Sequence, residues 1–311
     1  MKTLITGGAG FIGSHVADAC IADGHEVWII DDLSSGSRAN VPAKATLIEL
    51  DIRDLEALED VITDVRPDAV SHQAAQVSVA VSTREPQRDA RTNIIGTLNL
   101  LESCARNGVK HVVFASTGGA IYGEIPAPEK GQVGRVPTPL SPYACSKLAV
   151  EAYLGYYRHA HGLASTILRY ANVYGPRQDP HGEAGVVAIF AQRVLAGEPI
   201  QVNARAQAGD AGCIRDYVFV GDVVRANRMA LAGKIDVPII DVGTGIETTT
   251  QELAKKIEAA AGVKAKLGTG PKRAGDVERS VLEPWSGLGA TVPLEQGIAE
   301  TVAWFRARAT S

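Results

Sequence analysis

The sequence predicts an α/β protein, with a doubly wound parallel sheet and a smaller, loop-rich C-terminal lobe that binds the substrate. Short apolar runs alternate with helical patterns through residue 170, which is the pattern of a parallel sheet covered by helices on both faces. A glycine-rich turn joins the first apolar run to the first helical pattern. Beyond residue 171, proline and glycine become frequent and the elements become irregular, as is typical of a lobe that grips a ligand with loops.

The elements of the first part follow from apolar runs bounded by turn residues and from amphipathic stretches between them. We expect strands at 2–6, 26–30, 46–49, 68–71, 111–116 and 164–169, and helices at 11–23, 54–65, 86–107 and 141–161. A polar residue follows most of these strands. Because the carboxyl ends of parallel strands meet at one edge of a sheet, we expect the site at that edge.

The domain boundaries follow the change of pattern near residue 171. Residues 1–171 are expected to form the first domain, and the segment 215–245 is expected to return to it with a strand at 238–242. Residues 172–214 and 246–311 are expected to form mainly the lobe. Within the lobe, Thr249 and Glu252 predict a capping box that opens a helix over 250–261.

The turn after the first strand is rich in glycine. Gly7 permits the tight turn, Gly10 lets the backbone approach a pyrophosphate, and Gly13 lets the helix pack closely on its strand. The free N–H groups at the start of the helix, near Phe11 and Ile12, then bind the phosphates. This pattern predicts a Rossmann-type dinucleotide site, against the alternative of a strand–turn–helix without a ligand.

Asp31 supports the dinucleotide and selects the cofactor. It ends the second strand, 24 residues after Gly7, where a ribose needs an acceptor for its hydroxyl groups. A carboxylate repels the 2′-phosphate of NADP, and the neighbouring Asp32 adds to that repulsion. Arg38 is the basic residue that could bind a 2′-phosphate, but it lies seven residues further along, in a loop. We therefore predict NAD as the cofactor.

Composition excludes several classes of function. The net charge is −4 with no basic run, so we expect no nucleic-acid partner. We also expect no membrane partner, because no apolar run approaches the length of a membrane span and no secretory leader is recognisable. The four cysteines form no C-x-x-C pair and no metal-ligand spacing is present, so we expect a cytoplasmic protein with no metal. The segment 178–183 is better explained as a solvated turn than as a metal loop.

Tyr143 and Lys147 are the second strong signal. At this spacing on a helix, a phenol and an ammonium group lie on one face and reach the same ligand. A phenol with a pKa of ~10 is a poor base at neutral pH, but a nearby ammonium and the positive nicotinamide ring favour the phenolate. Packing on an exposed helix face is the alternative, and the dinucleotide motif upstream argues against it.

The chain resembles the extended short-chain dehydrogenase/reductases, most closely the UDP-glucose (UDP-galactose) 4-epimerase family. The matching motifs follow the family's order over nearly the whole chain. They are residues 6–13, 31–36, 51–52, 72–75, 93–97, 116–123, 143–147, 168–176, 215–222 and 273–276.

The resemblance implies roles for individual residues. Tyr143 would be the acid/base, and Lys147 would bind the nicotinamide ribose and tune the phenol. The NAD site would comprise Gly7, Gly10, Phe11, Ile12, Gly13, Asp31, Asp32, Leu33, Ser34, Ser35, Gly36, Asp51, Ile52, Gln73, Ala74, Ala75, Gln76, Asn93, Tyr143 and Lys147. The UDP-sugar would contact Thr117, Tyr143, Asn172, Arg215, Tyr217, Arg273 and Ser280.

The sequence departs from the family pattern in two places. The usual catalytic hydroxyl position is Gly118, so we expect Gly118 and Gly119 to bulge the chain and turn Thr117 into that role, with Ser116 as the alternative. The segment 283–290 is shorter than in the family and lacks its lysine, which weakens the predicted edge of the nucleotide pocket.

The function implied is NAD-dependent 4-epimerisation of a UDP-hexose through a transient 4-keto intermediate. The alternatives are a 4,6-dehydratase, a UDP-glucuronate decarboxylase, or a non-catalytic nucleotide-sensing module. The first two need an added carboxylate near the catalytic hydroxyl, where this chain has Gly119 and Ala120. Apolar stripes on helices 86–107 and 141–161 further predict a homodimer, as in the family. In the resembling epimerases, the residue that matches Ser280 borders the 2-position of the sugar, so the resemblance implies that the small Ser280 leaves room for N-acetylated sugars.

Overall fold

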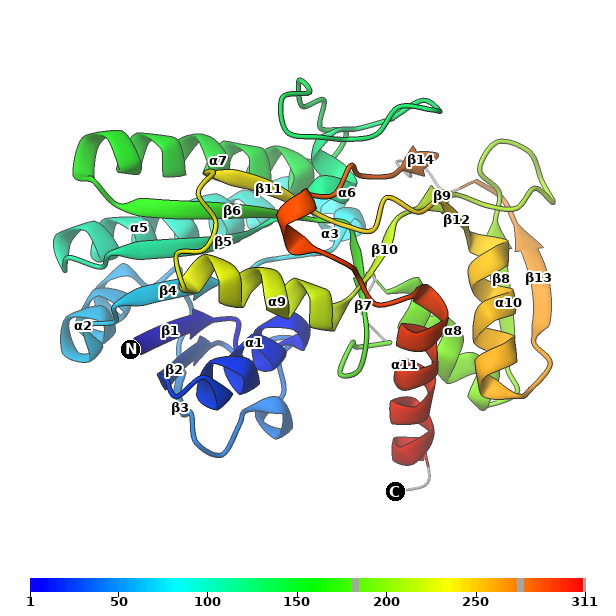
Figure 1. The fold of residues 1–311 in the computed structure, drawn as a ribbon, viewed down its shortest axis with the longest axis horizontal. Helices are drawn as coiled ribbons and strands as arrows, with labels where there is room; N and C mark the ends of the chain where they lie inside the picture. Colours follow the sequence, from blue (N-terminus) through cyan, green and yellow to red (C-terminus); the bar gives the residue numbers. More distant parts are fainter. Residues whose placement is uncertain (181–184, 273–276, 310–311) are drawn as a thin grey trace. The chain divides into compact units, whose positions relative to one another are not determined.

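The computed structural model describes residues 1–180, 185–272 and 277–309 (Figure 1). Its contacts divide the chain into two units. The first unit comprises residues 1–117, 141–169 and 224–240, and the second comprises residues 118–140, 170–223 and 241–311. This division returns a shorter segment to the first unit than the predicted 215–245, and it groups residues 118–140 with the second unit.

The central sheet has seven strands in the order β11-β6-β5-β4-β1-β2-β3, and the ladders on both sides of β1 are parallel. This order confirms the predicted doubly wound α/β fold, because the chain starts in the middle of the sheet and builds outward in both directions. The strands agree with the predicted ranges to within two residues. They are β1 (Lys2–Thr6), β2 (Glu26–Asp31), β3 (Thr46–Glu49), β4 (Ala69–His72), β5 (His111–Thr117), β6 (Ala164–Tyr170) and β11 (Ile239–Val242).

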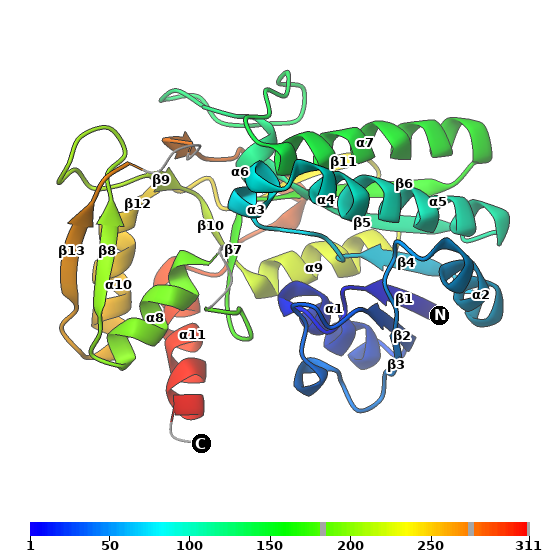
Figure 2. The ribbon, with the colours of Figure 1, turned by 180° about the vertical axis from the view of Figure 1, so that it is seen from behind.

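Helices cover both faces of this sheet (Figures 1 and 2). On one face, α2 (Leu55–Val65), α5 (Gly96–Arg106) and α7 (Pro142–His161) contribute to a buried apolar cluster with β1, β4 and β5. The other face carries α1 (Phe11–Ala22) and α9 (Val220–Leu231), which an ion pair between Asp23 and Arg228 joins. The short elements of this unit are η1 (Arg38–Asn40) and α3 (Val79–Arg84).

The helix predicted over 86–107 has three parts. They are α4 (Pro86–Ala90), a π-helical turn η2 (Arg91–Ile95) and α5. In the π-turn the Gly96 N–H bonds to the carbonyl of Arg91, five residues back. Such turns are rare in proteins, and those that occur often lie at functional sites. Hydrophobic periodicity does not reveal them.

The second unit is more regular than the predicted lobe. Three helices pack against one another: α8 (Val186–Leu195), α10 (Thr250–Ala261) and α11 (Leu294–Ala309). The predicted capping box of α10 is present. The loop after residue 203 is ordered by Asp210, whose carboxylate accepts N–H groups from four residues between 205 and 212.

Short strands complete the second unit. They are β7 (Asn172–Tyr174) beside β10 (Tyr217–Phe219), β8 (Pro199–Asn203) beside β13 (Lys266–Gly270), and β9 (Ile214–Arg215) between β12 (Thr248–Thr249) and β14 (Arg279–Ser280). The remaining short helices are α6 (Gly118–Ile121) and η3 (Ser286–Leu288). Because β10 pairs with β7, the start of the segment 215–245 belongs to this unit and does not return to the central sheet as expected.

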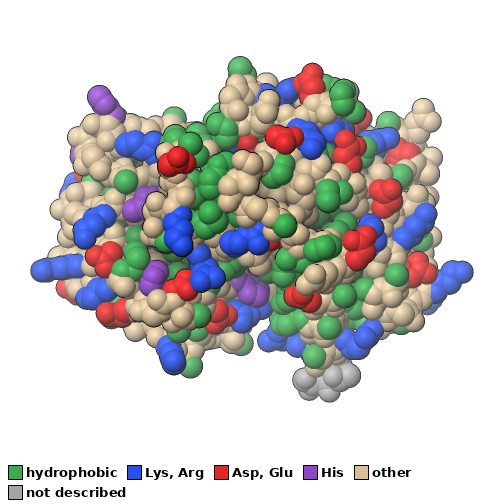
Figure 3. Space-filling model, viewed as in Figure 1, with side chains coloured by type: hydrophobic (Ala, Val, Ile, Leu, Met, Phe, Trp, Pro, Cys, Tyr) green, Lys and Arg blue, Asp and Glu red, His purple; other side chains and the backbone are tan. Residues whose placement is uncertain are grey.

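The surface mixes charges of both signs over the face drawn in Figure 3. Among the described residues, no helix is both long and apolar enough to cross a membrane. The same part of the chain holds no group of three or more potential metal ligands, and part of the segment 178–183 lies outside it.

Candidate active site

The glycine turn of the first unit is a tight backbone cradle. Gly7 has φ of +68°, and a Cβ added there would lie 2.6 Å from the backbone nitrogen of Ala74. A Cβ on Gly13 would lie 2.1 Å from the Gly7 carbonyl oxygen, so the helix touches the turn as predicted. No side chain caps α1, which begins at Phe11 after Gly10, and its first N–H groups are left for a ligand. These features fit a dinucleotide pyrophosphate.

Asp31 lies beside this cradle and is only 7% exposed. One carboxylate oxygen accepts the N–H of Ala9 and the other accepts the N–H of Leu33, both at 2.9 Å. Burial raises the pKa of Asp31, and the two N–H groups oppose that rise. Each oxygen retains a further lone pair, which is what a ribose hydroxyl requires. A Cβ on Gly36 would meet this carboxylate at 2.8 Å, so Gly36 fits closely against it.

The other predicted cofactor residues lie on the same unit. Asp32 is bound to its own loop, where it accepts the N–H and the hydroxyl of Ser34, and Ser35 follows in that loop. Asp51 pairs with Arg53, whose guanidinium lowers the pKa of that carboxyl. Buried Ile52 packs closely against Gly96 of α5, because a Cβ added to Gly96 would lie 2.7 Å from the Ile52 side chain.

Lys147 is buried on α7, one turn after Tyr143. Its Nζ donates to the carbonyl of Ala115 at 2.9 Å and lies 4.8 Å from the centroid of the Phe114 ring. The Tyr143 ring centroid is 6.0 Å from the same nitrogen, so the predicted pairing on one helix face is present. Burial lowers the pKa of Lys147 to about 8, and Asp89 opposes that shift.

The half-buried phenol of Tyr143 is hydrogen-bonded to Thr117. Burial and the Asp89 charge raise the pKa of Tyr143, and the hydrogen bond with Thr117 lowers it. The phenol is therefore neutral in the surroundings that this chain alone provides. A catalytic phenolate needs additional positive charge, which a bound nicotinamide ring would supply.

The two candidate hydroxyls at the end of β5 have different environments. Ser116 is 3% exposed and donates to Glu151 at 2.5 Å, and Glu151 also forms a buried ion pair with Arg169. Thr117 faces the phenol. The geometry thus favours Thr117, as expected, but the predicted bulge is wrong: Gly118 and Gly119 begin the helical turn α6, and neither has a positive φ. A glycine pair serves a helix start as readily as a bulge.

Asn93 joins the cofactor loop to the catalytic helix. Its Oδ1 accepts the N–H of Gln76 at 2.8 Å, and its Nδ2 donates to the Gln76 carbonyl at 2.9 Å. The same Nδ2 contacts Asp89 at 3.0 Å and the hydroxyl of Ser146 at 3.2 Å. Asp89 is buried and also accepts from the Gln76 side chain. Sequence reasoning overlooked Asp89, although it lies one helical turn before Asn93.

The substrate candidates of the second unit meet along β9 and β10. Tyr217 is paired with Asn172 between β10 and β7, and Arg215 is paired with Ser280 between β9 and β14. Within the described residues, the half-buried Arg215 makes one hydrogen bond, from Nη1 to the neighbouring Ile214 carbonyl at 3.0 Å. Its remaining donors are therefore available to a ligand. The predicted Arg273 lies outside the described residues.

Ser280 is buried, and its hydroxyl donates to the carbonyl of Gly119 at 3.0 Å. Its neighbour Arg279, which the sequence did not suggest, is buried as well. Arg279 donates to the carbonyls of Ile125 and Glu129 and pairs with Glu247. The described strand β14 therefore binds α6 through Ser280 and the segment after α6 through Arg279.

Two buried carboxylates organise the second unit, and no sequence pattern indicated their roles. Asp216 accepts N–H groups from Thr244, Gly245 and Leu282. Asp241 accepts the Tyr122 hydroxyl at 2.9 Å and, at 2.8 Å, the N–H of Val133. Long-range contacts of this kind have no local signature, because the partners are distant along the chain.

Comparison with known proteins places this geometry in context. Residues 3–243 match the family model described as NAD dependent epimerase/dehydratase family. The chain is 43% identical to the UDP-glucose 4-epimerase of Mycolicibacterium smegmatis over 98% of its length and 99% of that protein. A UDP-glucose 4-epimerase of Thermus thermophilus, solved with NAD, superimposes with a TM-score of 0.95 at 50% identity, over 98% of this chain and 99% of that one. A UDP-glucose 4-epimerase of Thermotoga maritima, solved with UDP-glucose, gives 0.94 at 47%, over 99% and 100%.

Proposed function

Because the chain belongs to the NAD dependent epimerase/dehydratase family, we propose that it is an NAD-dependent 4-epimerase of UDP-hexoses that interconverts UDP-glucose and UDP-galactose. The observation that carries this proposal is the triad on the first unit: a phenol bonded to Thr117, with the Lys147 ammonium beside it. That triad shares its unit with a backbone cradle for a dinucleotide. The likeness to epimerases over nearly the whole of both chains supports the same function.

In this proposal, each residue has a separate task. The glycine turn and Asp31 would hold NAD, which would supply reversible hydride transfer at sugar carbon 4. Tyr143 removes the proton of the 4-hydroxyl group and later returns it. Thr117 bonds to that phenol and orients the same hydroxyl, and Lys147 keeps positive charge near both. Asn172, Arg215 and Tyr217 hold the UDP group, with the Arg215 guanidinium offering a fork of donors to the diphosphate.

Elimination of water or carbon dioxide would need a second acid or base near Thr117. The turn after it, α6, carries no carboxylate. The first acid beyond it is Glu124, and both of its oxygens accept backbone N–H groups, from Glu278 and Arg279. This carboxylate is bound to the chain itself, which favours epimerisation over the dehydratase and decarboxylase alternatives.

The direct test is incubation of the purified protein with UDP-glucose and, separately, with UDP-galactose, followed by separation of the sugar nucleotides. We expect the same equilibrium mixture from either side. Formation of a stable 4-keto-6-deoxy product, or no conversion by NAD-loaded protein, would contradict the proposal. Tyr143→Phe is the matched inactive control.

We infer a broader substrate range from Ser280. Its side chain is small and lies on β14, paired with Arg215. A tyrosine there would add volume to a buried position, and overpacking costs ~1–3 kcal/mol. We expect UDP-N-acetylglucosamine to be converted, and Ser280→Tyr to lower its kcat/KM more than that for UDP-glucose. Equal effects on both substrates would remove Ser280 from the sugar site.

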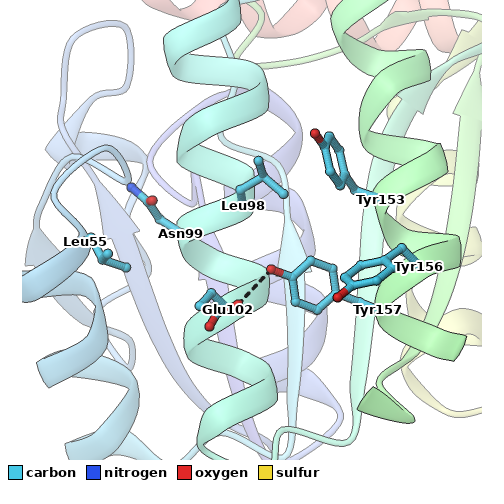
Figure 4. A pocket seen from close by; sticks show the side chains of 7 residues that line it. All are labelled: Leu55, Leu98, Asn99, Glu102, Tyr153, Tyr156 and Tyr157. Carbon is cyan, nitrogen blue, oxygen red and sulfur yellow. Dashed lines mark hydrogen bonds between the residues drawn. The ribbon is translucent and has the colours of Figure 1, made fainter. Parts of the chain in front are cut away.

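The homodimer is also a proposal, and an uncovered face of the first unit supports it. A pocket of about 350 Å³ lies over α2, α5 and α7 and is lined by Leu55, Leu98, Asn99, Glu102 and three tyrosines (Figure 4). The Tyr157 hydroxyl donates to Glu102 at 2.9 Å, so the polar centre of this apolar surface is already paired. Tyr153 and Tyr156 remain 41% and 55% exposed. A second copy of the same face is the occupant that we propose.

Light scattering of two charge variants tests this interface. Tyr156→Glu is expected to give monomers, because an isologous contact brings the two introduced charges together or buries them. Ile246→Glu places the same charge on an exposed apolar residue of the second unit and is expected to leave the dimer intact. A wild-type monomer, or a dimeric Tyr156→Glu variant, would contradict this interface.

The thiols support a reducing compartment, and we place the protein in the cytoplasm. Cys20 and Cys104 are buried, and burial raises the pKa of Cys20 to about 12, so this thiol is inert. Cys145 is exposed and unpaired. An exposed thiol persists where the surroundings are reducing.

A further inference from the structure

A buried chain of hydrogen bonds runs through His72 at the end of β4. The N–H of Ala74, in the dinucleotide cradle, points to the hydroxyl of Thr6 at 3.3 Å, and that hydroxyl lies 2.6 Å from His72 Nδ1. On the other side, His72 Nε2 lies 2.8 Å from the Thr97 hydroxyl. Thr97 in turn donates to the Asn93 carbonyl at 2.6 Å. The side chains of Thr6, His72, Thr97 and Asn93 are at most 2% exposed.

The donors and acceptors of this series of hydrogen bonds are compatible with only one neutral tautomer of His72. The proton of the Thr97 hydroxyl goes to the Asn93 carbonyl, which can only accept, so the hydroxyl oxygen must accept from Nε2–H. Nδ1 is then unprotonated and accepts the proton of Thr6, whose oxygen accepts from Ala74. The other neutral tautomer would set the lone pair of Nε2 against that of Thr97.

A charged His72 is disfavoured by its surroundings. The imidazole stacks on Phe114, with 5.8 Å between the ring centroids, and Lys147 Nζ lies over the same phenyl ring. Burial and the Lys147 charge together lower the pKa of His72 to about 3. The residue is therefore neutral whenever the protein is folded near neutral pH, and it takes no proton from the substrate.

The series of hydrogen bonds through His72 ends at the π-turn that carries Asn93. Thr97 bonds to a carbonyl of this turn, and the side chain of Asn93 holds both backbone groups of Gln76 and contacts Ser146 of α7. Ser146 donates to the carbonyl of Tyr143. The orientation of the turn therefore sets the position of the helix that carries the phenol.

We propose that His72, as the neutral Nε2–H tautomer, is a positioning residue that fixes the π-turn through Thr97 and thereby places Asn93 and the catalytic helix. His72 touches neither Tyr143 nor the sugar in this role. Relaxation of the turn to an α-helix would rotate Asn93 away from Gln76 and Ser146. The kinetic part of this inference rests on the proposed epimerase function.

The tautomer is tested without any substrate. In protein labelled with ¹⁵N-histidine, the signal missing from His72→Phe identifies His72 among the seven histidines. We expect a protonated Nε2, an unprotonated Nδ1 and no titration between about pH 5 and 8. A protonated Nδ1, or titration in that range, would overturn the proposal. This result does not depend on whether the protein is an epimerase.

The positioning role is tested at Thr97. Thr97→Val removes the hydroxyl and keeps the shape, and we expect kcat to fall roughly tenfold or more because small misplacements of a catalytic group are costly. KM for the UDP-sugar should stay within about twofold, since the second unit makes that contact in our proposal. Thr97→Ser restores the hydroxyl and should restore most of kcat. A normal kcat for Thr97→Val, or a kcat for Thr97→Ser as low as that of Thr97→Val, would contradict the proposal.

A second histidine–threonine pair supplies the control for lost stability. His111 Nε2 lies 2.9 Å from the Thr166 hydroxyl at the opposite end of β5 and β6, and Thr166 is also buried. Thr166→Val should lower the melting temperature by an amount similar to Thr97→Val while kcat stays unchanged. Equal losses of kcat in the two variants would reduce the role of Thr97 to stability alone. Inactive wild-type protein would refute the epimerase proposal and leave the tautomer result to decide this one.

Discussion

Two sets of buried polar groups, one around Asn93 in the first unit and one around Asp216 in the second, are hydrogen-bonded in different ways. In the first unit, side chains bond to side chains, as in the set of Gln76, Asp89, Asn93 and Ser146 and in the pair of Glu151 and Arg169. In the second unit, the buried Asp216 accepts mostly backbone N–H groups. A network of side chains fixes the geometry of particular groups, whereas a carboxylate bound to backbone fixes the course of loops. The first arrangement suits catalysis and the second suits ligand binding.

The largest expected effect is on the reaction itself. Tyr143→Phe removes only the proton-carrying oxygen from the first unit, so kcat should fall about 10²- to 10⁴-fold. KM for the UDP-sugar and the affinity for NAD should change little, because the ring remains in place. Steady-state kinetics and calorimetry measure these quantities. A variant with wild-type kcat would assign the base to another residue.

The comparison predicts unequal costs for two buried carboxylates. Glu151→Gln leaves the Arg169 guanidinium buried without its counter-charge, which costs ~3–5 kcal/mol. Asp216→Asn leaves neutral N–H groups with a poorer acceptor, which costs ~1–3 kcal/mol. Chemical unfolding should rank the variants in that order, and hydrogen exchange should show loosening of β5 and β6 in the first and of residues 244–245 in the second. The opposite ranking would invalidate the distinction between the units.

The second unit should affect binding more than turnover. Arg215→Ala removes the guanidinium donors, and a lost charged hydrogen bond of ~1.5–3 kcal/mol raises KM for the UDP-sugar about 10- to 100-fold. Because Arg215 does not take part in proton transfer, kcat should stay within about twofold. Arg215→Lys keeps the positive charge but loses the planar fork of donors, so its KM should lie between those of the wild type and Arg215→Ala. If kcat fell as much as kcat/KM, Arg215 would act on the transition state instead.

The same contrast explains what could be predicted from the sequence. The strands of the first unit, its glycine turn, Asp31 and the Tyr143–Lys147 pair follow from local periodicity and spacing, and the observed elements match them closely. The choice of Thr117 over Ser116 as the catalytic hydroxyl depends on Glu151, which binds the Ser116 hydroxyl and is far along the chain from β5. The π-turn at 91–95, the ties of Asp216 and the strand pairs of the second unit depend on long-range contacts, so hydrophobic periodicity could not reveal them.

The smallest expected effect is on the choice between cofactors, which also belongs to the first unit. Asp31→Asn removes the negative charge and keeps one oxygen that can accept the N–H of Ala9 or Leu33. Two like charges near 4 Å repel by ~1–4 kcal/mol, so the preference for NAD over NADP should narrow by about tenfold. Asp32→Asn is the matched control: its carboxylate is bound to Ser34 in an exposed loop, and screening by solvent should make the change smaller. Calorimetric titration with each cofactor measures both ratios. If wild-type protein bound NADP as tightly as NAD, or if Asp32→Asn narrowed the preference more than Asp31→Asn, the carboxylate at the end of β2 would not be the group that selects the cofactor.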